Sequence, residues 1–257
     1  MNITDAVSCM CDLANGEAEQ FDIIASNSHS EGISVFQGQV QNTEISDSVG
    51  LGIRVIKDGH PGYAHTERLT KDAIAQTIKD AVCHTQWTEP VNIELPKPAQ
   101  IPDDSPNYNP ALDSLSLAEL KDFCIELEKE TFARSADIKN IPYLGADLNR
   151  EISIVANSNG LFYTDKDNSV SVGAGAVAVR DGVSKLGNCV KSRRDWNEIS
   201  MKEIADKAAT YATELFGAKR IEGGKIPVIF SERIAGRFVG MYGSPFIAES
   251  MQKGMSR

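Results

Sequence analysis

The sequence predicts an α+β fold in which largely antiparallel sheets carry flanking helices. Two observations lead to this class. Short segments that alternate polar and apolar residues are joined by Asp-Gly or Asn-Gly pairs, which are typical of tight hairpin turns. Segments with helical spacing stand before, between and after these hairpins. The order is therefore helices separated by runs of strands, rather than a regular alternation of one strand with one helix.

The first 86 residues (1–86) are predicted to form one α+β unit. Its elements are a helix over 4–15, strands at 21–26 and 32–40, a hairpin over 50–66 and a helix that begins at Thr70. Asp58 and Gly59 supply the positive φ angles that a two-residue hairpin turn needs. Thr70 can cap the last helix, because its hydroxyl accepts a hydrogen bond from a free amide of the first turn.

Residues 87–115 differ from the rest of the chain because they hold most of its ten prolines. Proline lacks an amide donor, so it interrupts helices and is kept out of central strands. We therefore expect an extended connector that lies on a surface.

Residues 116–224 are predicted to form a second α+β unit that packs with the first. The sequences "SLAE" at 116–119 and "SMKE" at 200–203 are capping boxes, and each opens a helix. Between the helices, two hairpins turn at Asn159-Gly160 and Asp181-Gly182. The small residues from Gly173 to Ala176 stand in mid-strand, which predicts close approach by another backbone or element.

The last segment, 225–257, is predicted to start a C-terminal β-rich domain that is truncated in this chain. Pro227–Phe230 has the apolar composition of a strand. It leads directly into a segment with helical spacing that begins at Ser231.

Composition and charge exclude several classes of function. Net charge is −10, so direct binding to nucleic acid is not expected, and the one basic run, 191–196, is interpreted as a solvated strand end. No apolar run approaches the roughly 20 residues of a membrane span. The N-terminus carries acids and no basic region of a signal peptide. A cytoplasmic protein is the resulting expectation.

No self-sufficient catalytic site is apparent from the residues. The four histidines, His29, His60, His65 and His84, are interpreted as surface or capping residues. Three carboxylate pairs stand out, and they are interpreted in turn as part of the Pro-rich connector, as a polar turn or strand edge, and as a solvated helix face. None is framed by apolar residues that would raise a pKa. They are Asp103-Asp104, Asp165 with Asp167, and Glu128 with Glu130.

Four segments together resemble the TldD/PmbA family, once described as modulators of DNA gyrase and now as metallopeptidases. They are "GISVFQGQVQNTEISDSVGLGIRVIKDGHPGYAHTERLT", "EISIVANSNGLFYTDK", "ATELFGAKRIEGGKIPVIFSERIAG" and "AESMQKGMS". The first is the most specific, because it combines a strand, Gly-Leu-Gly-x-Arg-Val and an Asp-Gly hairpin. The resemblance covers nearly the whole chain and answers to the N-terminal part of the family pattern.

The resemblance implies a metal site that this chain lacks. In the TldD branch the helix after "PVIF" carries His-Glu-x-x-x-His and binds zinc. Its two histidine positions fall on Ser231 and Gly236, and its glutamate falls on Glu232. Serine and glycine cannot replace imidazole on zinc. The chain therefore resembles the PmbA (TldE) branch, with no metal or cofactor of its own.

The implied function is that of a non-catalytic subunit of a two-chain metal-dependent peptidase. The resemblance implies a TldD-like zinc-bearing partner, in a heterodimer, and substrates that are small modified peptides or unfolded polypeptides. A homodimer stays open as a second assembly. A different class also stays open, namely a scaffold that pairs with an extended peptide at a sheet edge and has no peptidase role. Regulation of DNA topology by direct binding ranks last because of the negative charge.

Overall fold

The computed structural model describes residues 1–98 and 107–255, which divide into a body, 1–217, and a C-terminal unit, 218–257. The body contains one sheet of six antiparallel strands in the order β3-β2-β1-β4-β5-β6. The strands are β1 Gln20–Phe36, β2 Gln39–Lys57, β3 His60–Thr66, β4 Ile138–Asn157, β5 Phe162–Arg180 and β6 Val183–Arg193. The α+β class with antiparallel sheet and flanking helices is confirmed.

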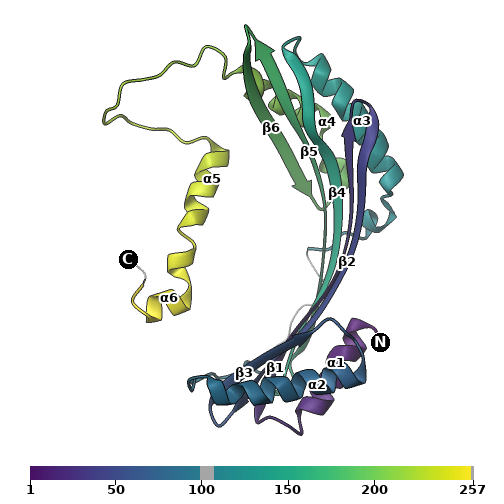
Figure 1. The fold of residues 1–257 in the computed structure, drawn as a ribbon, viewed down its shortest axis with the longest axis vertical. Helices are drawn as coiled ribbons and strands as arrows, with labels where there is room; N and C mark the ends of the chain where they lie inside the picture. Colours follow the sequence, from purple (N-terminus) through teal and green to yellow (C-terminus); the bar gives the residue numbers. More distant parts are fainter. Residues whose placement is uncertain (99–106, 256–257) are drawn as a thin grey trace. The chain divides into compact units, whose positions relative to one another are not determined.

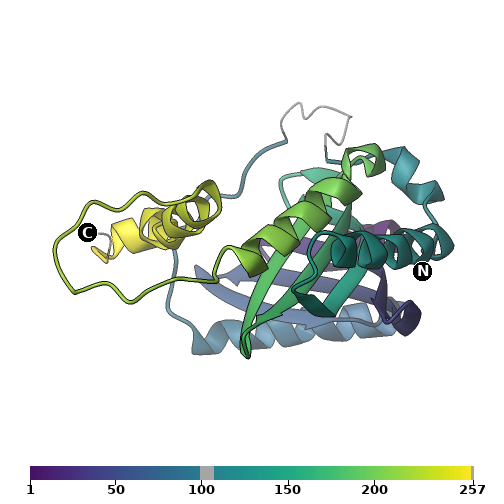
Figure 2. The same ribbon diagram turned by 90° about the horizontal axis from the view of Figure 1, so that it is seen from above.

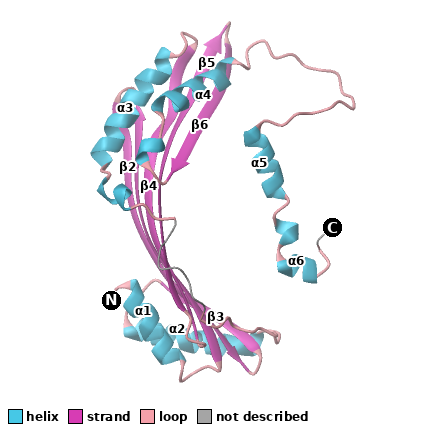
Figure 3. Cartoon of the chain, turned by 180° about the vertical axis from the view of Figure 1, so that it is seen from behind, coloured by secondary structure: helices cyan, strands magenta, loops and turns pink. Residues whose placement is uncertain are grey.

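Four helices of the body lie on one face of this sheet, as Figures 1 and 2 show. They are α1 Ile3–Ala14, α2 Lys71–His84, α3 Leu117–Ala133 and α4 Met201–Thr213. The strands curve along their length, and the helices follow the outer side of the curve (Figure 3). We call this side the covered face and the opposite side the open face.

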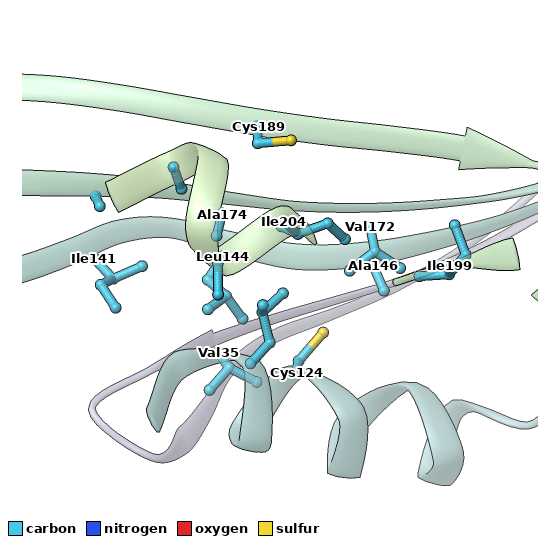
Figure 4. Close-up of a cluster of buried hydrophobic side chains, with 14 of the residues drawn as sticks. Val35, Cys124, Ile141, Leu144, Ala146, Val172, Ala174, Cys189, Ile199 and Ile204 are labelled. Carbon is cyan, nitrogen blue, oxygen red and sulfur yellow. The ribbon is translucent and has the colours of Figure 1, made fainter. Parts of the chain in front are cut away.

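The covered face holds two separate hydrophobic cores, because the strands are long enough to serve both ends. At one end, Phe21, Ile23 and Ala25 of β1 pack with α1 and α2. At the other end, Ile33 and Val35 of the same strand pack with α3 and α4. Figure 4 shows this second core, where labelled side chains of the strands and of both helices point toward one another. The periodicity of two along β1 places all these side chains on one face.

The helix starts predicted from the sequence are confirmed, with one difference. Thr70 accepts from the amide of Ala73, and Ser116 forms the full capping box with Glu119. Ser200 accepts from the amide of Glu203, but the Glu203 carboxylate does not complete a box. It bonds instead to Lys191 on β6 at 2.7 Å and to Lys207 at 2.9 Å. Two ammonium groups are stronger partners for a carboxylate than one backbone amide.

The strand predictions at the N-terminus were wrong in one respect. Residues 21–26 and 32–40 were expected as two strands, whereas β1 is continuous and turns into β2 at Gln37-Gly38. Both turn residues have positive φ, at 52° and 72°, like the confirmed turn at Asp58-Gly59. Glu128 on α3 explains this turn, because its buried carboxylate accepts from the amides of Gln37 at 2.7 Å and Gly38 at 2.5 Å. The expectation that Glu128 is solvated was therefore wrong.

Two further expectations need correction. The connector was expected to contain no helix, but Pro110–Ser114 forms a 3₁₀ helix with Asn109 as its N-cap. Proline is tolerated there because it occupies the first turn, where an amide has no partner. Pro227–Phe230 was expected as a strand but has no regular structure. A strand needs a neighbour for its backbone groups, and the described part of the C-terminal unit holds only α5 Glu232–Met241, α6 Ala248–Gln252 and a 3₁₀ turn.

Candidate functional site

The open face of the body is the candidate site, because it bears large exposed side chains and two hollows. Among residues 1–98 and 107–217, no helix packs on this face. Ile24, Tyr143 and Val190 point outward from β1, β4 and β6 and are 67%, 69% and 64% exposed. Large exposed apolar side chains on one face are typical of surfaces that bind a ligand or another protein.

The first hollow has a volume of about 490 Å³ and spans five strands near the α3/α4 end. We call it the glycine hollow, because its floor is largely backbone. Four glycines lie in or beside this floor: Gly32, Gly145, Gly173 and Gly175. Hydrogen-bonding register places Gly145 opposite Gly173, and Gly145 also pairs with Ser34 on β1.

Side chains cannot be added to this floor without displacing a neighbour. A Cβ on Gly145 would lie 2.6 Å from the carbonyl oxygen of Ile33. A Cβ on Gly173 would lie 2.8 Å from Cγ2 of Val190. Glycine in a strand interior costs stability, so a run of such positions indicates a place where another group approaches the backbone closely.

Two carboxylates stand at one end of the glycine hollow. Glu44 on β2 and Asp147 on β4 are each the register partner of Gly32 on β1. A Cβ on Gly32 would lie 2.8 Å from Oδ1 of Asp147, so this carboxylate lies over the glycine. Partial loss of hydration raises the pKa of Asp147, and the negative charge of Glu44 raises that pKa further.

The second hollow, of about 430 Å³, lies at the α1/α2 end of the same face. We call it the arginine hollow. Arg54 bonds to Asp22 through Nε at 2.9 Å and through Nη2, and this pairing raises the pKa of Arg54. Ile24 and Tyr63 form an exposed apolar wall beside this pair. The arginine hollow is therefore largely apolar, and the positive charge of Arg54 is already paired with Asp22.

The positions singled out by the family resemblance lie on the C-terminal unit. Ser231 is the N-cap of α5 and its side chain makes no capping bond, Glu232 is the first residue of the helix, and Gly236 is in its middle. All three are exposed. No group of three or more His, Cys, Asp or Glu side chains across the described residues could hold a metal ion. A hydroxyl and a hydrogen atom do not fit the donor set of a zinc site.

The histidines named from the sequence have local roles. His60 and His84 each bond through Nδ1 to a backbone carbonyl, at 2.6 and 2.7 Å. His65 lines the arginine hollow. His29 lies on the covered face between the two cores, where Asp47 at 2.7 Å and Glu31 at 3.1 Å hold its ring and raise its pKa.

The remaining charged groups named from the sequence are distributed over several elements. Arg194, in the basic run at 191–196, pairs with Asp167 at 2.6 Å. Glu130 pairs with Arg134 on the surface of α3. The pair Asp103-Asp104 lies outside the described residues. Neither the Arg194–Asp167 pair nor the Glu130–Arg134 pair lines either hollow.

The sequence pointed to part of the glycine hollow but not to its charge. Gly173 and Gly175 were noticed as mid-strand glycines, and they face the hollow, whereas Ala174 and Ala176 alternate with them and are buried on the covered face. The close approach of a helix occurs elsewhere, at Gly187, where a Cβ would lie 2.1 Å from the amide nitrogen of Ala212. Glu44 and Asp147 are distant in sequence and meet only through strand register.

Two domain models of one family match this chain. "PmbA/TldA metallopeptidase domain 1" matches residues 21–82, and "PmbA/TldA metallopeptidase central domain" matches residues 110–216. The chain therefore belongs to the TldD/PmbA metallopeptidase family. The first model covers most of β1 to β3 with most of α2, and the second covers the 3₁₀ helix at 110–114, α3, β4 to β6 and α4.

Individual relatives agree with the family. The chain is 24% identical over 253 residues to Metalloprotease PmbA of Escherichia coli O157:H7, and the match covers 94% of this chain and 54% of that protein. The chain thus spans about half the length of the curated relative that it matches.

Solved structures share the fold. A candidate modulator of DNA gyrase from Bacteroides thetaiotaomicron gives a TM-score of 0.87 at 16% identity, over 97% of this chain and 58% of that one. TldE from Thermococcus kodakarensis gives a TM-score of 0.71 at 18% identity, over 80% of this chain and 46% of that one.

No helix across the described residues is long and apolar enough to cross a membrane.

Proposed function

We propose that this chain is the subunit without zinc in a two-chain, metal-dependent peptidase of the TldD/PmbA family. A TldD-like partner supplies the metal and the hydrolytic chemistry. Small modified peptides and unfolded polypeptides are the proposed substrates. The open face of the body then forms one wall along which an extended peptide lies.

One observation carries this proposal. The positions that correspond to the zinc ligands of the TldD branch hold Ser231 and Gly236, and residues 226–257 contain no histidine at all. Neither residue offers a nitrogen or sulfur ligand, which supports the proposal that a partner chain supplies zinc-dependent hydrolysis. The exposed hollows on the sheet support a role in holding peptide rather than in cutting it.

The test uses this chain together with a family member from the same cells that carries His-Glu-x-x-x-His. Each protein is purified alone and after co-expression, and zinc content is measured beside cleavage of dye-labelled unfolded casein. We expect a stable pair that contains zinc and cleaves casein, while this chain alone does neither. Glu232→Gln is expected to leave the rate of the pair unchanged, whereas the corresponding change in the partner's motif abolishes it. Stoichiometric zinc and cleavage by this chain alone would overturn the proposal.

The two hollows also favour a second candidate function, a peptide-binding scaffold without peptidase activity. This alternative predicts that the chain binds unfolded peptide but forms no pair with a zinc-bearing relative. The co-expression experiment separates the two, because a metal-free homo-oligomer that never associates with the partner supports the scaffold.

A further inference from the structure

The glycine hollow has an apolar side and a negatively charged end, arranged along one direction. Tyr143 and Asp147 are four residues apart on β4, which corresponds to about 13 Å along a strand. The glycine floor lies between them at Gly145. Val190 and Leu186, both at least half exposed, extend the apolar side along β6. A long side chain laid on this floor would have its stem over Gly145 and its tip near Asp147, while Tyr143 would contact the next part of the peptide.

The charge at that end is not neutralised by the protein. In the described part of the chain, no ion pair joins Glu44 or Asp147 to a cation. The two carboxylates flank Gly32 from neighbouring strands, which brings two negative charges to the same place. The arginine hollow differs, because Asp22 there is matched by Arg54. A cation is therefore the complementary ligand for the glycine hollow alone.

We propose that the glycine hollow binds an arginine or lysine side chain of an extended peptide, with the cation between Glu44 and Asp147 and the methylene stem over the glycine floor at Gly145. This inference rests on the proposed function, and it adds a preference for basic peptides. Long basic side chains place an apolar stem and a charged head in different surroundings, which is what the two parts of the hollow offer. The volume of about 490 Å³ leaves room for the side chain and its flanking backbone.

The hollow disfavours the other kinds of ligand that a sheet face could take. A phosphate backbone or an acidic peptide would bring negative charge against Glu44 and Asp147. A purely apolar side chain would leave both carboxylates partly desolvated without a partner. Backbone pairing at a sheet edge would not discriminate between side chains at this position, since the hollow lies across the face of the sheet.

The experiment measures binding of four fluorescein-labelled decapeptides to the full chain by fluorescence anisotropy. The peptides consist of glycine and serine and differ at two central positions, which hold arginine, citrulline, norleucine or glutamate. Citrulline keeps the shape of arginine without its charge, and norleucine keeps only the stem. We expect the arginine peptide to bind about three- to tenfold more tightly than the citrulline peptide, which corresponds to two partly exposed charge pairs.

A double variant and a matched control locate the effect. Glu44→Gln with Asp147→Asn is expected to bring the arginine and citrulline peptides to within about twofold of each other. Asp12→Asn with Glu17→Gln changes net charge by the same amount on α1 and the loop after it, and it is expected to keep the preference. Because the peptide series is measured on the wild-type chain, the main comparison does not depend on how any variant folds.

Three outcomes would overturn the inference. The first is equal affinity for the arginine and citrulline peptides. The second is no binding of the arginine peptide at about 1 mM, which corresponds to a binding free energy of roughly −4 kcal/mol. The third is an unchanged preference in the Glu44/Asp147 variant. None of them bears on zinc or on pairing, so the proposed function would survive. Conversely, if the chain prefers the arginine peptide but never forms a zinc-bearing pair, the proposed function is wrong and the inference about the glycine hollow still holds.

Discussion

On the covered face of the sheet a glycine marks a place where a helix touches a strand, and on the open face a glycine forms part of the floor of a hollow. Gly187 belongs to the first kind, because α4 passes directly over it and a Cβ there would meet the backbone of Ala212. Gly173 belongs to the second kind, because the nearest atom is the end of an exposed valine side chain. The same residue type thus serves packing on one side and access on the other.

This difference extends to the charged groups of the two faces. On the covered side Glu128 is buried and fully used, since each of its oxygens accepts a bond from a turn amide. On the open side Asp147 is pushed toward its neutral form by its surroundings. An ionisable side chain in unfavourable surroundings lowers the stability of the fold. Proteins retain such side chains mainly at functional sites. The following predictions test whether the two faces divide in this way.

The largest effect is expected from Gly187→Ala. The new methyl group would collide with the backbone of α4, which cannot move without disturbing the core that includes Ala208 and Ala212. Overpacking of this kind costs about 3 kcal/mol, and in a protein of this size that lowers Tm by roughly 6 to 12 °C. Thermal unfolding followed by far-UV circular dichroism measures it.

Gly173→Ala is the matched change on the open face. Val190 can rotate away, and the loss of a flexible glycine from a strand compensates, so the change in stability is expected to stay within about 1 kcal/mol. The methyl group would nevertheless fill part of the hollow and weaken binding of the arginine peptide. Equal losses of Tm for the two glycine variants would show that the faces do not differ as described.

The second effect concerns the turn between β1 and β2. Glu128→Ala removes both acceptors from the amides of Gln37 and Gly38, and the loss of these bonds to a charged group is expected to cost about 2 kcal/mol. Glu130→Ala, two residues along the same helix, removes only a surface pair with Arg134 and is expected to cost below about 1 kcal/mol. Urea unfolding of both variants gives the comparison. A cost for Glu128→Ala as small as that for Glu130→Ala would mean that the turn holds its shape unaided.

These two glutamates illustrate how far the sequence could be interpreted. Helical spacing located α3, and the capping box located its first residue, because both signals are local. Glu128 and Glu130 are both acids on that helix, and nothing local separates them. The difference arises because a hairpin about ninety residues earlier in the chain approaches one and not the other.

The same limit applies to turns and to the candidate site. Asp58-Gly59 and Asp181-Gly182 were predicted because aspartate tolerates positive φ. Gln37-Gly38 was missed because glutamine has no such preference, and Glu128, which accepts from both turn amides, lies about ninety residues further along the sequence. Glu44 and Asp147 face one hollow only because of the register of three strands, and a shift by one residue would turn each side chain to the other face.

The smallest effect has the opposite sign. Asp147→Asn is expected to raise stability at pH 7, because the pKa of Asp147 is raised in the folded chain and its ionised form is therefore disfavoured there. In the wild-type chain, protonated Asp147 favours the folded state. This contribution to stability is lost as pH rises from about 3.8, the ordinary pKa of aspartate, through the higher pKa of Asp147 in the folded chain. The gain in Tm is expected to stay below about 3 °C, since Asp147 is largely open to solvent. It should shrink at pH 3.5, where the aspartate is mostly protonated in both the folded and the unfolded state.

Asp22→Asn provides the contrast on the same face. It leaves Arg54 without the partner that holds it at two points, so stability at pH 7 is expected to fall rather than rise. The Tm values of the wild-type chain, Asp147→Asn and Asp22→Asn, measured at pH 7 and at pH 3.5, test both expectations. If Asp147→Asn instead destabilises the chain at pH 7, then the Asp147 carboxylate contributes to the fold, and its charge in the glycine hollow is no longer an argument for a cationic ligand.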